Sequence, residues 1–313
     1  MTGPMILLDS LRKTYGHFVA VAGLSLRVEG GECFGLLGPN GAGKTTTINM
    51  IAGLLMPTAG TVHIAGTSLT AHPRQAKINL GLVPQDFAVY PALSARDNLV
   101  FFGRLYGLWG RALATRIRYA LDIVRLADRA EVPVSTYSNG MKRRLNLAIG
   151  LLHDPAVLIL DEPTVGVDAH SRHAIVSSLK DLIESGKTLL YCTHHLWEAE
   201  ALCSRVAIMD LGRVIALDTP RQLIREHGTG LIRVEFELPV NESLLRALEG
   251  FGAVCQASSR LAGFQFQSSE PNTALEKVLK LADEWSTGVR SAQLLEPTLE
   301  TVFLNLTGRS VRD

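Results

Sequence analysis

The stretch that most constrains this chain is a glycine-rich run that follows the apolar residues Phe34 to Leu37 and ends in a lysine and two threonines. Its spacing matches the pattern G-x-x-x-x-G-K-[ST], in which backbone N–H groups surround phosphate oxygens. Glycines lack a β-carbon, so the backbone can turn sharply and approach the phosphates closely. The predicted phosphate-binding loop, called the cradle below, consists of Gly38, Pro39, Asn40, Gly41, Ala42, Gly43, Lys44, Thr45 and Thr46.

The polar residues of the cradle each meet a need of a bound polyphosphate. Lys44 is expected to reach the β and γ phosphates, and the Thr45 hydroxyl to ligate Mg2+. We expect a helix from Thr47 to Leu55, whose positive dipole end favours a bound anion. The alternative is a glycine-rich turn without a ligand. It is disfavoured because glycines, lysine, hydroxyl and flanking elements all agree with the pattern.

A pair of carboxylates, Asp161 and Glu162, follows the apolar run Val157 to Leu160. An unbroken apolar run is typical of a central parallel strand covered on both faces. Open α/β sheets bind ligands at the carboxyl ends of their strands. Asp161 is therefore expected to hold Mg2+, directly or through water, and Glu162 to polarise an attacking water. The alternative is two solvated carboxylates that open a loop.

Three other residues carry weaker signals. His194 ends the strand predicted from Lys187, where it either reaches a γ-phosphate or caps and packs locally. Tyr15 lies ahead of the first predicted strand and either stacks on a nucleotide base or packs as an ordinary core residue. Gln85 closes the strand predicted from Leu80.

A serine at a predicted helix start gives a second anion-binding signal. Ser138 begins the sequence Ser-Asn-Gly-Met-Lys, and the helix is expected to start near Asn139 or Gly140. Its free N–H groups and dipole favour an anion. The alternative is a serine that caps the helix and does nothing more.

Composition limits the class of protein. With 313 residues and 47% hydrophobic content, the chain has enough apolar material for two or three packed domains. The net charge of +1 argues against nucleic acid as a partner. We see no secretory signal, and no stretch reaches the roughly 18 uninterrupted apolar residues that a membrane span requires.

The cysteines give no metal or disulfide signal. Cys33, Cys192, Cys203 and Cys255 are widely separated and form no C-x-x-C pair. We expect small core residues in a reducing compartment. The adjacent histidines 194 and 195 make a poor metal clamp, and we predict no structural zinc.

The periodicities predict two domains. Residues 1–228 form an α/β domain with a helical insertion at about residues 91–156. Near its start, strands at 24–28 and 33–37 are expected to pair as a hairpin through Gly30-Gly31.

Residues 229–313 show the order β-α-β-β-α-β, which indicates a small ferredoxin-like α+β domain. A helix is expected at 241–248, a turn at 260–263 and a last helix from Pro297. No residue set in this domain looks catalytic, so we interpret it as a regulatory or contact domain.

Taken together, these stretches resemble the nucleotide-binding subunit of an ATP-binding cassette (ABC) transporter, from Met5 to about Leu223. The implied fold is a P-loop NTPase core with a helical subdomain and an antiparallel β subdomain. Tyr15 matches the family's adenine-stacking aromatic residue. The motifs appear in the family's order: Walker A at Gly38 to Thr46, the Q-loop at Gln85, the signature at Ser138 to Lys142, Walker B at Val157 to Glu162, the D-loop at Asp168 and the H-loop at His194.

The resemblance implies an ATPase that uses ATP and Mg2+. Glu162 is then the general base, His194 contacts the γ-phosphate, and Gln85 senses the metal and the water. Thr45, Gln85 and Asp161 form the implied metal site. Ser138, Gly140 and Met141 of the signature, with Asp168, are the remaining nucleotide-binding residues, and the signature completes the site of the opposite subunit.

The implied partners are a second copy of the chain, or a related cassette, closing head to tail around two ATP molecules, and a separate integral membrane permease. The chain is then a peripheral protein at the cytoplasmic face of the inner or plasma membrane. The tail Glu296 to Leu304 looks like the C-terminal extension of the multidrug and antibiotic-resistance exporter subgroup, which works with a separate membrane subunit in the export of drugs, lipids, polysaccharides or antibiotics. The transported substrate cannot be identified from the sequence.

The sequence departs from the family pattern at two positions. Asn139 replaces the first of two signature glycines; asparagine tolerates left-handed backbone, but its side chain is expected to alter the γ-phosphate contact and slow hydrolysis. Val167 replaces a leucine without expected consequence. Two alternatives stay open: a soluble cassette ATPase that acts on ribosomes or DNA, and a regulatory ATP-binding module with weak turnover.

Overall fold

The computed structural model describes residues 3–228, 230–237, 244, 246–248, 254–258, 261–268 and 270–308. The chain divides into two compact units, residues 1–220 and 221–310. The division lies at the start of helix α8 (Pro220–His227), ahead of residue 228, where the sequence patterns place the end of the first domain. Each unit has its own hydrophobic core.

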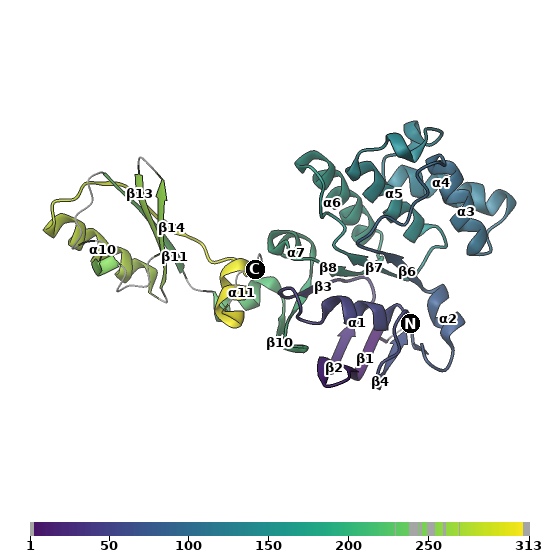
Figure 1. Ribbon diagram of the computed structural model, residues 1–313, viewed down its shortest axis with the longest axis horizontal. Helices are drawn as coiled ribbons and strands as arrows, with labels where there is room; N and C mark the ends of the chain where they lie inside the picture. The colour runs from purple at the N-terminus through teal and green to yellow at the C-terminus, as the bar shows by residue number, and fades with distance from the viewer. Residues whose placement is uncertain are drawn as a thin grey trace. The chain divides into compact units, whose positions relative to one another are not determined.

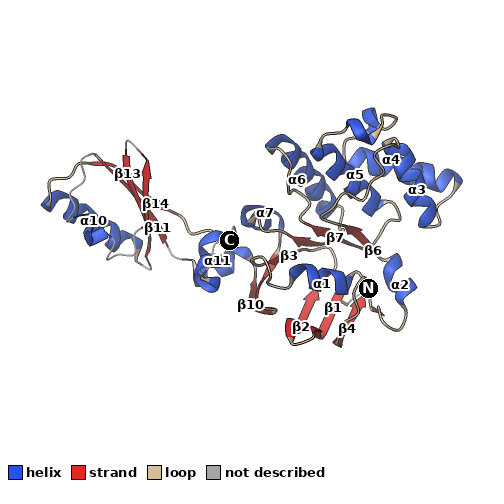
Figure 2. Ribbon diagram, in the orientation of Figure 1, coloured by secondary structure: helices blue, strands red, loops and turns tan. Residues whose placement is uncertain are grey.

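The first unit is built on a six-stranded sheet with the order β10-β9-β3-β8-β7-β6 (Figure 1). Its strands are β3 (Cys33–Leu37), β6 (Leu80–Val83), β7 (Val157–Asp161), β8 (Thr188–Cys192), β9 (Arg205–Asp210) and β10 (Arg213–Asp218). Neighbouring strands are parallel except β9 and β10, which form a closing antiparallel pair. Strands β3, β7 and β8 are buried along their whole length. Helices cover both faces of this sheet (Figure 2), which is why these strands are apolar without interruption.

A second sheet in this unit is antiparallel, with the order β2-β1-β4-β5. Its strands are β1 (Ile6–Tyr15), β2 (Phe18–Val28), β4 (Ala59–Ile64) and β5 (Thr67–Ser68). The expected hairpin through Gly30-Gly31 is wrong, because β2 pairs with β1 while β3 joins the parallel sheet. The two glycines carry the chain from one sheet to the other.

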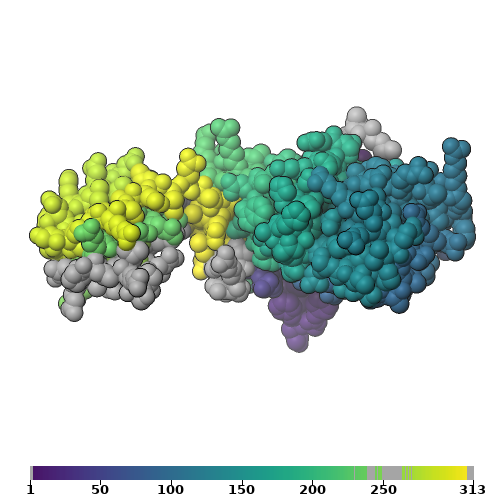
Figure 3. Space-filling view, turned by 90° about the horizontal axis from the view of Figure 1, so that it is seen from above, coloured from purple at the N-terminus to yellow at the C-terminus, as the bar shows by residue number. Residues whose placement is uncertain are grey.

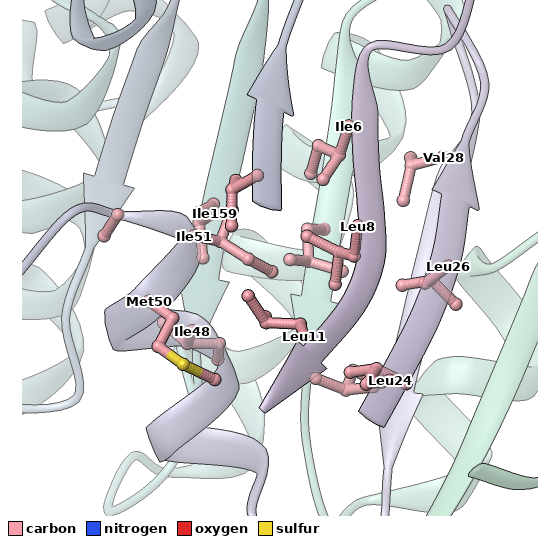
Figure 4. Packing of buried hydrophobic residues seen from close by; sticks show 14 of the residues in the cluster. Ile6, Leu8, Leu11, Leu24, Leu26, Val28, Ile48, Met50, Ile51 and Ile159 are labelled. Carbon is pink, nitrogen blue, oxygen red and sulfur yellow. The ribbon is translucent and has the colours of Figure 1, made fainter. Parts of the chain in front are cut away.

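Helix α1 (Lys44–Ile51) lies between the two sheets. Its buried residues Ile48, Met50 and Ile51 pack in one core with Leu8 and Leu11 of β1 (Figure 4). The helix begins earlier than the predicted range of 47–55, because Gly43 within the cradle is already its N-cap residue, and it also ends earlier, at Ile51. The core therefore fixes the cradle to both sheets.

The helical segment lies within the predicted range of 91–156. It consists of α3 (Ala95–Leu105), α4 (Gly110–Ile123), two short 3-10 turns (Ala127–Arg129 and Val134–Thr136) and α5 (Asn139–Leu151). The space-filling view shows these blue to teal helices packed against one another over a broad part of the first unit (Figure 3). Ser94 caps α3 by accepting a hydrogen bond from the N–H of Asp97 at 3.0 Å, which satisfies one of the free N–H groups of the helix start.

The remaining helices of the first unit are α2 (Pro73–Ile78), α6 (Ala169–Glu184) and α7 (Leu196–Leu202). Helices α5 and α6 lie on the face of the parallel sheet opposite to α1 (Figure 1). Helix α6 begins directly after Asp168, which is its N-cap residue.

The second unit is built on an antiparallel sheet with the order β12-β13-β11-β14, and its ferredoxin-like fold stays a prediction. Its elements are β11 (Gly230–Phe236), β12 (Val254–Ser258), β13 (Leu261–Ser268), α10 (Pro271–Glu284), β14 (Val289–Leu295) and α11 (Leu299–Thr307). Phe236, Phe264 and Val278 belong to its core. The turn expected at 260–263 is wrong over 261–263, which are paired in β13.

Two expectations for this unit are only partly described. Residues 244 and 246–248 are helical, and the rest of the helix expected at 241–248 lies outside the described residues. The side chain of Cys255 lies outside them as well. The last helix starts at Leu299 rather than Pro297, with Thr298 as its cap.

Close approach of helix α5 to strand β6 gives a test of this packing. A β-carbon on Gly81 would lie 2.4 Å from the carbonyl oxygen of Gly150. We expect Gly81→Ala to lower the free energy of unfolding by about 1–3 kcal/mol, since backbone cannot yield as a flexible side chain does. The control is Gly30→Ala, whose β-carbon would meet Met5 at an ordinary 3.8 Å. Thermal unfolding midpoints that fall equally in both variants would contradict this packing.

Candidate functional site

The cradle is closed around the amino group of Lys44. Lys44 is the first residue of α1 and is buried, and its Nζ donates to the carbonyl oxygens of Gly38 at 2.7 Å and Pro39 at 2.9 Å. The cation therefore lies inside the loop, and the free N–H groups of the helix start lie beside it. A cation beside the free N–H groups of a helix start favours a bound anion such as a phosphate.

Close contact with neighbouring strands explains why two positions of the cradle are glycine. A β-carbon on Gly38 would lie 2.5 Å from the oxygen of Met209 in β9, and one on Gly43 2.5 Å from the oxygen of Ala20 in β2. The turn after β9 also donates a hydrogen bond from Gly212 N to the oxygen of Ala42 at 3.0 Å. The cradle is thus shaped by both sheets, which sequence reasoning missed, because it assigned these glycines to the phosphates alone.

The two carboxylates lie at the end of β7, beside His194. Asp161 is the last residue of the strand, and both Asp161 and Glu162 are buried. His194 Nδ1 lies 2.8 Å from Glu162 Oε2, although the geometry is not that of a hydrogen bond, and Oε2 is a buried oxygen without a hydrogen-bond partner. A buried carboxylate oxygen of this kind is available to accept a proton or a hydrogen bond from a bound water.

Electrostatics link the carboxylates to the cradle. Burial raises the pKa of the Asp161 carboxyl, and the nearby charge of Glu162 raises it further. The hydrogen bond with Cys192 and the charge of Lys44 lower the pKa in opposition. Lys44, Asp161 and Glu162 thus lie within one electrostatic neighbourhood. A bound divalent cation would favour the ionised form of Asp161.

Gln85 lies in the loop after β6, two residues beyond the end of the strand that it was expected to close. Its backbone oxygen accepts a hydrogen bond from the guanidinium of Arg143 in α5, which also donates to the oxygen of Val165 at 3.3 Å. Burial lowers the pKa of Arg143, and Asp86, Glu162 and Asp161 act against that shift. Sequence reasoning missed Arg143, because the oxygens that it contacts belong to residues far from it in the sequence.

Ser138 and Asp168 form a second group at the adjoining starts of α5 and α6. Ser138 Oγ accepts a hydrogen bond from the N–H of Met141 at 3.2 Å, and Asp168 accepts one from the N–H of Ser171 at 2.9 Å. That N–H lowers the pKa of Asp168. A β-carbon on Gly140 would lie 2.1 Å from Ser171 Oγ, so this glycine sets the spacing of the two helix starts.

Asn139 does not need the left-handed backbone for which asparagine seemed suited. It is the first residue of α5 and is absent from the described residues with positive φ. Asparagine fits at position 139 because the backbone there is ordinary α-helix, which any residue with a β-carbon can adopt. Its side chain is exposed beside Ser138, where an effect on a bound phosphate stays a prediction.

The other predicted residues are accessible. Thr45 and Gln85 are exposed, and Thr46 is partly so. Tyr15 is 50% exposed at the end of β1, with Lys13 Nζ 5.3 Å from its ring centroid. An exposed ring is free to stack on a base.

The described residues include no group of three or more His, Cys, Asp and Glu side chains that could hold a metal ion. None of the helices in the described parts of the chain has the length and apolarity to cross a bilayer. Cys33, Cys192 and Cys203 are free and buried, as expected for small core residues.

Comparisons with known proteins agree with this geometry. A family model described as ABC transporter matches residues 21–165. The linearmycin resistance ATP-binding protein LnrL of Bacillus subtilis (strain 168) is 39% identical, over 99% of this chain and 100% of that protein. The Nod factor export ATP-binding protein I of Ralstonia nicotianae is 40% identical, over 99% of this chain and 96% of that one.

The solved structures match only part of this chain. The matched share is about as large as the first unit, residues 1–220. An ATP-binding subunit of an ABC transporter is 29% identical, with a TM-score of 0.64 over 71% of this chain and 92% of that chain. A dimeric ATP-binding cassette in a post-hydrolysis state, bound to ADP and phosphate, is 27% identical, with a TM-score of 0.62 over 69% of this chain and 98% of that chain. From its fold, its cradle and its full-length relatives, the chain belongs to the ATP-binding subunits of ABC transporters.

Proposed function

We propose that this chain hydrolyses ATP at a site formed by its cradle, Glu162 and His194, and that the reaction drives export through a separate membrane permease. The observation that carries the proposal is the pair Glu162 and His194, 2.8 Å apart at the edge of the sheet where the cradle begins. Glu162 acts as the general base toward water, and His194 contacts the γ-phosphate. ATP binding and hydrolysis are the activities of the family to which the chain belongs.

Mg2+ fits the donors that the chain offers. Thr45, Gln85 and Asp161 each offer a side-chain oxygen, the kind of ligand that Mg2+ prefers, and Thr45 and Gln85 are exposed. When bound, the ion neutralises charge on the phosphates. The protein side chains orient the nucleotide around it.

The signature group is proposed to act on the nucleotide of a second copy. Ser138, Gly140 and Met141 lie with Asp168 at the starts of α5 and α6, on the face of the sheet opposite to α1 (Figure 1). A helix start arriving from another subunit adds N–H donors to the γ-phosphate and excludes water. Tyr15 stacks on the adenine in this arrangement. One solved relative is itself a dimer with ADP and phosphate.

The membrane partner and the direction of transport rest on the relatives. Their names describe linearmycin resistance and Nod factor export, and we propose export for this chain as well, from the cytoplasmic face of the membrane. We assign residues 1–228 to the cassette and 229–313 to a regulatory or contact domain. A soluble cassette ATPase without a permease and a weakly hydrolysing regulatory module are the alternatives. The presence of both Glu162 and His194 argues against the second.

An exposed aromatic cluster beside Gln85 is proposed as the permease contact. Phe87, Tyr90 and Phe101 are each 39–47% exposed, and the rings of Tyr90 and Phe101 meet edge to face at 5.0 Å. Adjacent exposed aromatic side chains mark interaction sites more often than scattered ones do. A permease bound here would sense the loop of Gln85 directly.

Substituting the base tests the hydrolytic role. We expect Glu162→Gln to lower ATP turnover by about 10²-fold or more while it retains ATP binding, because the amide cannot take a proton from water. A dimer should then accumulate in ATP and Mg2+. Phosphate release and size-exclusion chromatography measure the two effects. The control is Glu184→Gln at the exposed end of α6, and turnover equal in the two variants would remove Glu162 as the base.

The two signature positions should respond differently. We expect Gly140→Ala to weaken ATP-dependent dimer formation by about tenfold, because its β-carbon overlaps Ser171 and must displace the start of α5. Asn139→Gly should leave dimer formation intact, since residue 139 has ordinary helical backbone. Both are measured in the Glu162→Gln background. Partial recovery in Gly140→Ala with Ser171→Gly would identify the overlap as the cause, and a normal Gly140→Ala dimer would refute it.

The aromatic contact predicts a loss of membrane association. We expect Tyr90→Ser with Phe101→Ser to reduce recovery of the chain with its membrane fraction several-fold while ATP turnover of the purified chain is kept. Trp197→Ser in α7, a side chain that is 51% exposed, serves as the control. Unchanged membrane recovery of the double variant would place the permease elsewhere.

A further inference from the structure

Glu198 is a carboxylate buried beneath the catalytic edge. It lies in the first turn of α7 and has no exposed surface. Its Oε2 accepts hydrogen bonds from Thr164 Oγ1 at 2.9 Å and from the hydroxyl of Tyr191 at 2.5 Å. A buried carboxylate is unfavourable unless its hydrogen bonds or charge have partners, so its place in the fold needs an explanation.

The partners of Glu198 come from each of the segments that carry catalytic residues. Thr164 is fully buried two residues after Glu162, in the loop that leads to Asp168. Tyr191 lies in β8, three residues before His194. Helix α7 itself begins two residues after His194. One carboxylate thus joins the loop after β7 to the loop after β8.

A third contact reaches helix α6. Glu198 Oε1 lies 3.8 Å from Nε of Arg172, in the first turns of the helix that Asp168 caps. Both atoms are buried and have no hydrogen-bond partner, so their attraction is electrostatic. Burial raises the pKa of Glu198, and the hydrogen bonds from Tyr191 and Thr164 and the charge of Arg172 act against that rise.

Stability alone does not explain this arrangement. Replacing a buried charge and its partners by apolar residues of the same shape is often neutral or stabilising. A carboxylate with two hydroxyl donors and a cation, in contrast, fixes the relative positions of three segments. The free-energy cost of burying Glu198 is then explained by a need of the function for fixed positions of these three segments.

We infer that Glu198 is a positioning residue of the ATPase site: through Thr164, Tyr191 and Arg172 it holds the loops of Glu162, Asp168 and His194 in their catalytic arrangement. The inference rests on the proposed function of Glu162 and His194. It assigns no chemical step to Glu198. A displacement of about 1 Å at these loops is enough to slow the reaction of a bound substrate.

Thr164 provides the cleanest test, since it can lose its hydroxyl without losing volume. We expect Thr164→Val to lower kcat for ATP about tenfold with KM changed less than about twofold, because nucleotide binding by the cradle is untouched. Thr164→Ser keeps the hydroxyl and should restore kcat to within about twofold. Glu198→Gln should lower kcat to a similar extent, and the double variant Thr164→Val with Glu198→Gln should be no slower than the slower single variant.

Ser178→Ala is the matched control for a buried hydroxyl. Ser178 in α6 is fully buried and donates to the oxygen of Ile123 at 2.7 Å, far along the helix from Asp168. This variant should keep both kcat and KM. Thermal unfolding of every variant is measured in parallel, and Glu198→Gln provides the test if Thr164→Val does not fold.

The outcomes separate the inference from the proposed function. If Thr164→Val turns over like the wild-type chain, or if Thr164→Ser is as slow as Thr164→Val, the positioning role is refuted. The positioning role is also refuted if Thr164→Val and Glu198→Gln change only KM or only the unfolding temperature. Glu162→Gln would still be inactive in each of these cases, whereas an active Glu162→Gln would overturn the proposed function itself.

Discussion

The register between the parallel strands β7 and β8 is the constraint on which the site depends. Asp161 is paired with Cys192, and the N–H of Glu162 donates to the oxygen of Cys192 at 2.9 Å. Glu162 and His194 therefore leave the sheet side by side. Pairing of Leu36 with Cys192 brings the cradle to the same edge. A slip of one residue would turn each side chain to the opposite face, so the buried apolar strands determine the chemistry at their tips.

The backbone of Glu162 is strained where the chain leaves β7. Its φ is 50°, a left-handed value that costs a residue with a β-carbon about 1 kcal/mol or more. Two hydrogen bonds hold it there: its N–H donates to Cys192, and its oxygen accepts from the N–H of Val165 at 3.3 Å. This turn directs the carboxylate toward His194. The strain is tolerated because the surrounding pairings fix the backbone on both sides.

Sequence patterns predicted the buried parallel strands and the cradle, because each of these signals is local. Strand β1 was not predicted, since the register shift between Leu8 and Leu11, where Ser10 has a positive φ, interrupts its alternation. The sequence patterns paired β2 with β3 instead of β1. The reason is that Gly30-Gly31 is typical of a hairpin turn, although the two strands that it connects belong to different sheets. Short helices such as α2 give too few turns for a periodic signal.

The candidate site was predicted to the extent that its residues lie in contiguous motifs. The cradle, the carboxylates and His194 were predicted in this way, and the structure places them at one edge of the parallel sheet. Arg143 and Glu198 were not found, because each is defined by partners far away in sequence: Gln85 and Val165 for the first, Thr164 and Arg172 for the second. Tertiary contacts of this kind leave no mark on local periodicity.

The starts of α5 and α6 show why one chain does not hold a complete site in the proposed arrangement. Ser138 and Asp168 each use a side-chain oxygen to accept a hydrogen bond from their own helix, and contact between Gly140 and Ser171 locks the two starts together. The cradle helix α1 lies on the other face of the sheet (Figure 1). Because contact between Gly140 and Ser171 fixes the start of α5 on the face opposite to α1, the proposed arrangement takes the N–H groups of α5 for the nucleotide in the cradle from a second chain. In the proposed arrangement, this rigid packing within each subunit is what makes ATP a ligand shared between subunits.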